Sequence, residues 1–306
     1  MPLSPNLRGA LFMMVAMAGF TLNDAITKFS SESMNIAQVM LVRGVFASLF
    51  VGLLAWHRGA LAKPAAMLQP MVAVRVAGEA GGTVSFLIAL SHLPIANVSA
   101  VLQALPLAVT MGAALVFGEG VGWRRWLAIA IGFAGVLVIV RPGFEGFSIY
   151  SLLALTSVVC CAVRDLATKR IPPAIPSMLV STATALAMTI LGALLLSPMG
   201  GWTPMTGRAT ALLALAAVLV IIGYQFIIMA MRSGAISFIA PFRYTALLWS
   251  ILLGIVVFSD IPDLAMTVGA TIIIGSGLYA LYRERIVGRR QPAAESAGPQ
   301  MAPDGI

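Results

Sequence analysis

Two short stretches decide how this chain is organised: NDAITK at residues 23–28 and RDLATK at residues 164–169. They share the pattern D-x-x-T-K and lie 141 positions apart. At the same offset, the pattern Phe-x-acidic at residues 117–119 recurs at residues 258–260. Two distant matches that need no gap indicate an internal repeat, although apolar helices of simple composition can also match by coincidence.

The composition places both copies of the repeat in a membrane. Hydrophobic residues make up 60% of the chain and charged residues only 10%, whereas a soluble domain carries about 25% charged residues. A helix of about 20 apolar residues crosses the core of a bilayer. Ten segments qualify, at residues 7–27, 36–56, 70–92, 95–117, 124–140, 147–168, 176–197, 209–231, 236–258 and 263–283.

These segments predict an all-α membrane protein with ten transmembrane helices, arranged as two inverted five-helix repeats. We expect the first repeat over residues 1–143 and the second over residues 144–287. Residues 288–306 are rich in Pro, Ala and Gly and predict a disordered cytoplasmic tail. Because five is odd, the second repeat enters the membrane upside down, an arrangement that lets two halves of a transporter rock around a shared site.

The basic residues orient the chain. With the N-terminus in the cytoplasm, thirteen Lys and Arg residues, Arg164 among them, fall on the inner side and only three fall outside. This bias predicts a multi-pass protein of the inner (plasma) membrane with both termini cytoplasmic. The net charge of +8 is thereby explained by the membrane faces, and no nucleic-acid partner is expected.

Several stretches of the first half are similar to a known family. RWLAIAIGFAGVLVIVRPG at residues 125–143, LPIA at 93–96, LPL at 105–107 and FGE at 117–119 resemble an EamA repeat of the drug/metabolite transporter (DMT) superfamily. The resemblance covers the first half well, over residues 7–143, and the second half more loosely.

The resemblance implies a function as well as a fold. It implies a central cavity lined mainly by the first, third, fourth, sixth, eighth and ninth spans. It also implies secondary transport of a small polar or amphipathic metabolite, such as an amino acid, a nucleoside-like cofactor or a vitamin, by efflux or exchange. The opening segment resembles the subgroup that includes S-adenosylmethionine and riboflavin importers, so uptake of that type is the alternative.

Charged residues inside spans are candidates for substrate binding or ion coupling, because burying a charge in a membrane is costly. Glu79 lies about 13 Å deep in the third span, and Arg75 precedes it by one turn. Arg43 and Arg243 lie about 10 Å deep in the second and ninth spans. Arginine suits a carboxylate or phosphate, and Glu79 suits an ammonium group or a proton. The alternative is structural: Arg75 and Glu79 pair with each other, and Arg43 reaches the interface.

Two further sets of residues follow from the repeat. Gln103 and Tyr244 are polar residues at matching positions of the fourth and ninth spans, and both are candidates to line the cavity. Asp24 with Lys28, and Asp165 with Lys169, lie near span ends at opposite membrane surfaces. Each set is either a helix-end ion pair or a gate that closes one side at a time.

The sequence offers little to support other chemistry. It has no phosphate-binding loop of the type G-x-x-x-x-G-K-[ST] and no cluster of metal ligands. We therefore expect no cofactor, no metal and no enzymatic activity, although a membrane-embedded enzyme without a recognised motif stays as an alternative of another class. The expected partners are a small-molecule substrate, the lipid bilayer and, as a candidate coupling ion, the proton. The expected state is a monomer or weak dimer.

Overall fold

The structure is a computed structural model that describes residues 4–61, 64–118, 120–142, 147–172, 174–233 and 236–287. Within these ranges every regular element is a helix, and ten helical spans are long and apolar enough to cross a membrane. The predicted all-α fold with ten transmembrane helices is therefore confirmed. The predicted repeat boundary at residue 143 and the predicted tail at 288–306 lie outside the described residues.

The observed helices agree with the predicted spans to within a few residues, except that two spans are divided. The helices are α1 Pro5–Ser31, α2 Ile36–His57, α3 Pro70–His92, α4 Ile95–Leu102, α5 Leu105–Phe117, α6 Trp123–Val140, α7 Ile149–Lys169, α8 Ser177–Leu196, α9 Gly207–Ser233, α10 Ile236–Ile239, η2 Ala240–Tyr244, α11 Thr245–Phe258 and α12 Leu264–Val287, with a short η1 at Pro64–Leu68.

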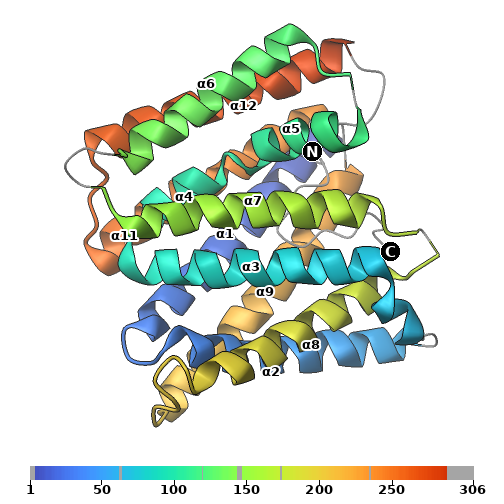
Figure 1. The fold of residues 1–306 in the computed structure, drawn as a ribbon, viewed down its shortest axis with the longest axis vertical. Coiled ribbons are helices and arrows are strands. Elements are labelled where there is room, and N and C mark those ends of the chain that lie inside the picture. The colour runs from blue at the N-terminus through green and yellow to red at the C-terminus, as the bar shows by residue number, and fades with distance from the viewer. Residues whose placement is uncertain are drawn as a thin grey trace.

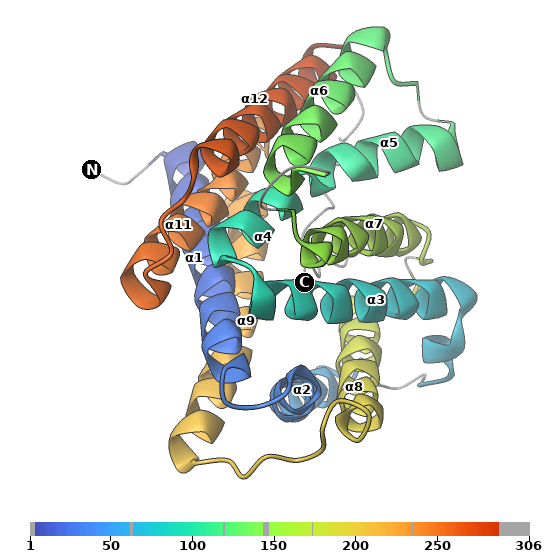
Figure 2. The ribbon, with the colours of Figure 1, turned by 60° about the vertical axis from the view of Figure 1, so that its left-hand side comes forward.

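The helices pack in four long pairs, α1 with α9, α3 with α7, α2 with α8, and α6 with α12. Figures 1 and 2 show these pairs side by side, with α4, α5 and α11 between them. If the halves are exchanged, α1 becomes α7 and α9 becomes α3, so the first pair maps onto the second. The pairs α2–α8 and α6–α12 map onto themselves, as inverted repeats require.

The repeat is visible at the level of single residues. The hydroxyl groups of Ser48 on α2 and Thr189 on α8 lie 3.0 Å apart, and the two positions differ by 141. Residues related by a pseudo-twofold axis meet each other only where the axis passes. Gly82 of α3 lies against Cys161 of α7, and the same offset places Gly223 of α9 against Phe20 of α1.

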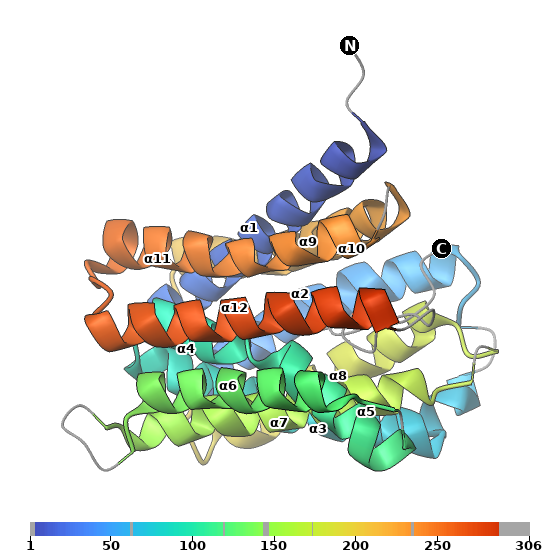
Figure 3. The ribbon, with the colours of Figure 1, turned by 90° about the horizontal axis from the view of Figure 1, so that it is seen from above.

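Figure 3 shows the helices running across the bundle, with the start of α1 and the end of α12 on the same side. This follows from an even number of spans. Which of the two faces lies in the cytoplasm stays a prediction from the basic residues. Large apolar side chains on the outer surface, such as Leu49 and Leu53 at 62% exposure each, suit contact with lipid, because a surface this apolar is foreign to a soluble monomer.

Prolines divide the fourth and ninth spans, which the sequence analysis expected to be continuous helices. Pro106 stands at the start of α5 and Pro241 at the start of η2. A proline cannot donate a backbone hydrogen bond, and its ring displaces the preceding turn. Consequently α4 ends at Leu102, and η2 separates α10 from α11. The two interruptions fall at corresponding positions of the two halves.

Candidate functional site

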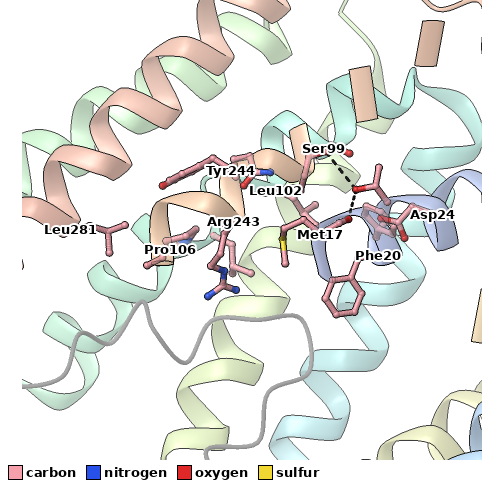
Figure 4. Close-up of a pocket in the computed structure, with 15 residues that line it drawn as sticks. Met17, Phe20, Asp24, Ser99, Leu102, Pro106, Arg243, Tyr244 and Leu281 are labelled. Carbon is pink, nitrogen blue, oxygen red and sulfur yellow. Dashed lines mark hydrogen bonds between the residues drawn. The ribbon is translucent and has the colours of Figure 1, made fainter. Parts of the chain in front are cut away.

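A cavity lies at the two interruptions (Figure 4). Four residues singled out from the sequence line it: Asp24, Gln103, Arg243 and Tyr244. The full lining is Met17, Phe20, Thr21, Asp24, Phe86, Ser99, Leu102, Gln103, Leu105, Pro106, Ala240, Arg243, Tyr244, Ala246 and Leu281. These residues come from α1, α3, the α4–α5 region, the η2–α11 region and α12. The first, third, fourth and ninth spans thus contribute as expected. The sixth and eighth spans, also expected, supply none of these lining residues, and the tenth contributes through Leu281.

The interruptions explain why polar residues reach this cavity. Gln103 follows the end of α4, and Tyr244 ends η2; the repeat relates these two positions. Backbone groups at such a break lack regular helical partners, and inside a membrane they are tolerated only where protein or a cavity surrounds them. Of the lining residues, Asp24 and Arg243 carry opposite charges and come from opposite halves of the chain.

A hydrogen-bonded group on α1 and α2 fixes the acidic side of the cavity. The Arg43 guanidinium on α2 donates to Asn23 Oδ1 at 3.1 Å and to Thr27 Oγ1 at 3.4 Å. Asn23 in turn donates from Nδ2 to Asp24 Oδ1 at 2.9 Å. Arg43 therefore points inward at α1, and the alternative in which it reaches the membrane interface is wrong. Arg43 thus supports Asp24 through Asn23, and Asp24 lines the cavity.

The second half contains a buried ion cluster at the position that the repeat relates to Asn23 and Asp24. The Nε atom of Arg164 on α7 donates to Asp165 Oδ1 at 2.8 Å, and the Nη2 atom of Arg164 lies 2.7 Å from the same oxygen. Its Nη1 atom lies 3.2 Å from Oε2 of Glu79 on α3. All three side chains are buried, Arg164 at 1% exposure. Placing Arg164 among the basic residues at the inner face was therefore wrong.

Arg75 departs from its expected pairing. It lies one turn before Glu79, but its Nη1 atom donates to Thr184 Oγ1 of α8 at 2.5 Å, and Glu79 is bound by Arg164. The structural alternative of an Arg75–Glu79 ion pair is thus wrong, because each residue binds a partner on another helix. The repeat relates Thr184 to Arg43, so the second half carries a hydroxyl where the first half carries a guanidinium, and Arg75 of the first half donates to that hydroxyl.

The two lysines of the D-x-x-T-K pattern also bind elsewhere than to their neighbouring aspartates. Lys28 Nζ donates to the carbonyl oxygens of Leu90 at 3.0 Å and Leu93 at 2.5 Å, at the end of α3. Lys169 Nζ lies 5.6 Å from the ring centre of Phe117 at the end of α5. Of the two alternatives, the helix-end ion pairs are therefore not observed, and both lysines contact separate helices instead.

Arg164 was not expected from the sequence to belong to the buried cluster. A signal was present, since Arg164 stands five residues before the end of α7 and directly beside the repeated aspartate. The partner Thr184 carried no comparable signal, because a hydroxyl group in an apolar helix is common. Phe117 was marked by the repeat with Phe258, but nothing in the sequence assigned it to Lys169. Among the described residues, no group of three or more metal-ligating side chains is found.

Comparisons with known proteins agree with this architecture. Residues 7–141 match the EamA-like transporter family. The chain is 28% identical to a riboflavin transporter of Rhizobium johnstonii, covering 93% of this chain and 94% of the relative. It is 25% identical to the pseudopaline exporter CntI of Pseudomonas aeruginosa (90% and 96% covered) and 25% identical to an S-adenosylmethionine uptake transporter of Rickettsia prowazekii (92% and 95% covered).

A solved crystal structure of a protein at 20% identity aligns with a TM-score of 0.63 over 92% of this chain and 99% of the other. At that identity the likeness concerns the fold alone. Together with the ten apolar helices, the match of residues 7–141 and the relatives support a multi-pass membrane protein of the drug/metabolite transporter superfamily, whose first half is similar to the EamA-like transporter family.

Proposed function

We propose that this protein is a secondary transporter of a small polar or amphipathic metabolite across the inner membrane, working by alternating access, with its substrate site in the cavity at the two interrupted spans. One observation carries this proposal. The breaks after Leu102 and within residues 240–244 stand at corresponding positions of two inverted halves, and both contribute to one cavity. Paired discontinuous helices are where secondary transporters bind their substrates.

The lining suits an amphipathic solute. Asp24 and Arg243 supply one charge of each sign, so they can hold a cationic and an anionic group of the same molecule. Gln103 supplies both a hydrogen-bond donor and an acceptor. Phe20, Phe86 and Tyr244 offer aromatic surface against which an apolar or aromatic part packs.

The roles of the remaining candidates differ from this binding role. Arg43 orients Asp24 through Asn23. Glu79 binds Arg164, and Arg75 binds Thr184, so these residues join helices beside the cavity. If protons drive transport, Asp24 is the carboxylate placed to bind a proton in competition with substrate, because it is the acidic residue of the lining. Glu79 is the second candidate for this role.

Uptake is the alternative to efflux or exchange. It is favoured by the similarity to an uptake transporter for S-adenosylmethionine, whereas the similarity to a pseudopaline exporter favours efflux. The experiment is therefore flux in both directions through proteoliposomes, with a panel of radiolabelled amino acids, nucleoside-like cofactors and vitamins, with and without a pH gradient.

The expected result is saturable flux of one class of solute, lost in Asp24→Asn and in Arg243→Gln. Glu79→Gln serves as the comparison for coupling. If the pH dependence disappears in Asp24→Asn and persists in Glu79→Gln, the cavity carboxylate couples transport. If flux is unchanged in both cavity variants, the substrate site lies elsewhere.

A further inference from the structure

Lys28 joins three helices at the end of α1. Its ammonium group donates to the carbonyl oxygens of Leu90 and Leu93, where α3 ends, and it lies 5.3 Å from the ring centre of Phe258 in the last turn of α11. A cation held over an aromatic face is attracted by the negative charge of that face. The side chains of both Lys28 and Phe258 are half-buried, which strengthens this attraction.

The same contact recurs in the other half, at the opposite end of the bundle. Lys169 and Phe117 stand at the positions that the offset of 141 relates to Lys28 and Phe258, and their ammonium-to-ring distance is 5.6 Å. The helix ends match as well. Phe117 precedes Gly118 at φ 65°, and Phe258 precedes Ser259 at φ 57°. Each phenylalanine is therefore the last residue of a helix that a left-handed residue ends.

We propose that these two contacts are latches that close opposite ends of the transport path. The first latch is Lys28 with Phe258, and the second is Lys169 with Phe117. This rests on the proposed transport function. Each latch ties a helix of one pair, α1 or α7, to the end of an interrupted span of the other half, α11 or α5. Breaking one latch lets those two elements separate at one membrane face only.

The position of the cavity agrees with a closed first latch. Asp24 lines the cavity one turn before Lys28, and Leu281 lines it 17 residues into α12. Because α12 starts at the face of the bundle where α11 ends with Phe258, Leu281 lies about 26 Å along α12 from that face, at 1.5 Å per residue. The cavity therefore begins about one helical turn inside the first latch and extends toward the membrane face of the second latch.

The two latches differ in the groups that surround each ring. The ammonium of Lys28 has two carbonyl partners in addition to the ring. Lys169 is exposed, but Arg170 also covers Phe117, with its guanidinium carbon 4.6 Å from the ring centre. Loss of Lys169 alone thus leaves a cation on the ring. Replacing Phe117 removes the aromatic ring that Lys169 and Arg170 both contact.

The test is sided labelling of the cavity. Ser99→Cys, in a background with Cys160→Ala and Cys161→Ser, places one thiol in the cavity lining. A membrane-impermeant maleimide is applied to right-side-out and to inside-out vesicles. Lys28→Met and Phe258→Leu are expected to raise the labelling rate about tenfold from the face where α1 ends, and not from the other face.

Phe117→Leu is expected to raise labelling from the face where α1 begins, and Lys169→Met to raise it less, because Arg170 remains. Arg124→Met is the control, since Arg124 lies 5.3 Å from the ring of Trp123 within α6 and joins no two helices. Equal increases at both faces would indicate general loosening and overturn the proposal, as would unchanged labelling in variants that elute as folded protein. Sided labelling without flux of any solute would support the latches and contradict the transport function instead. Flux of a solute without sided changes in labelling would support the transport function and contradict the latches.

Discussion

Replacing Arg164 by methionine tests the buried ion cluster most directly. Arg164 is 1% exposed and contacts two carboxylates, Glu79 at 3.2 Å and Asp165 at 2.7 Å, which are themselves 5% and 4% exposed. Methionine fills much of the same volume but leaves both carboxylates without their cation. Removing one partner of a buried pair costs about 3–5 kcal/mol, because the remaining charge is uncompensated.

The measurement is the thermal unfolding midpoint of the detergent-solubilised protein, followed by intrinsic fluorescence. A loss of about 3–5 kcal/mol lowers the midpoint by about 6–10 °C, at about 2 °C per kcal/mol for a chain of this size. Glu79→Gln is expected to cost only about 1–2 kcal/mol, because the Arg164–Asp165 pair remains and the amide oxygen still accepts from Arg164.

A triple variant separates charge from packing. Glu79→Gln, Arg164→Met and Asp165→Asn together remove every charge of the cluster while keeping its volume, so most of the lost stability is expected to return. Two results would refute the reasoning: Arg164→Met within about 1 kcal/mol of the unmodified protein, or a triple variant no more stable than Arg164→Met alone.

Two glycine substitutions give further tests, each with a matched control. A Cβ atom on Gly78 would lie 2.9 Å from two backbone atoms of α7. Gly78→Ala is therefore expected to force α3 and α7 apart and to lower the free energy of unfolding by about 2–3 kcal/mol, measured by thermal unfolding. Gly52→Ala is the control, because its Cβ atom meets nothing within 4 Å and stability stays nearly unchanged. A Cβ atom on Gly277 would collide with the hydroxyl of Tyr244 in the cavity, while one on Gly275 meets nothing. Gly277→Ala is therefore expected to weaken substrate binding several-fold in a flux assay and Gly275→Ala to leave it unchanged; equal values for the two would show that Tyr244 does not shape the site.

The sequence by itself determined the architecture. Length and hydropathy of each span suffice to define a transmembrane helix, because inside a bilayer the backbone must satisfy its own hydrogen bonds. The D-x-x-T-K repeat indicated two halves related by an offset of 141, and Ser48 meets Thr189 at that offset in the structure. The same offset paired Gln103 with Tyr244, and both residues line the cavity at the interrupted spans.

Only the tertiary structure decided which charges meet. Spacing on one helix suggested that Arg75 binds Glu79, but side chains of neighbouring helices come closer, and Arg164 and Thr184 take these partners. Lys28 likewise binds the end of α3 and the ring of Phe258. A long flexible side chain takes whatever partner lies within its reach in three dimensions. Its partner is therefore set by how helices far apart in the sequence are packed, which hydropathy and spacing along one helix do not encode.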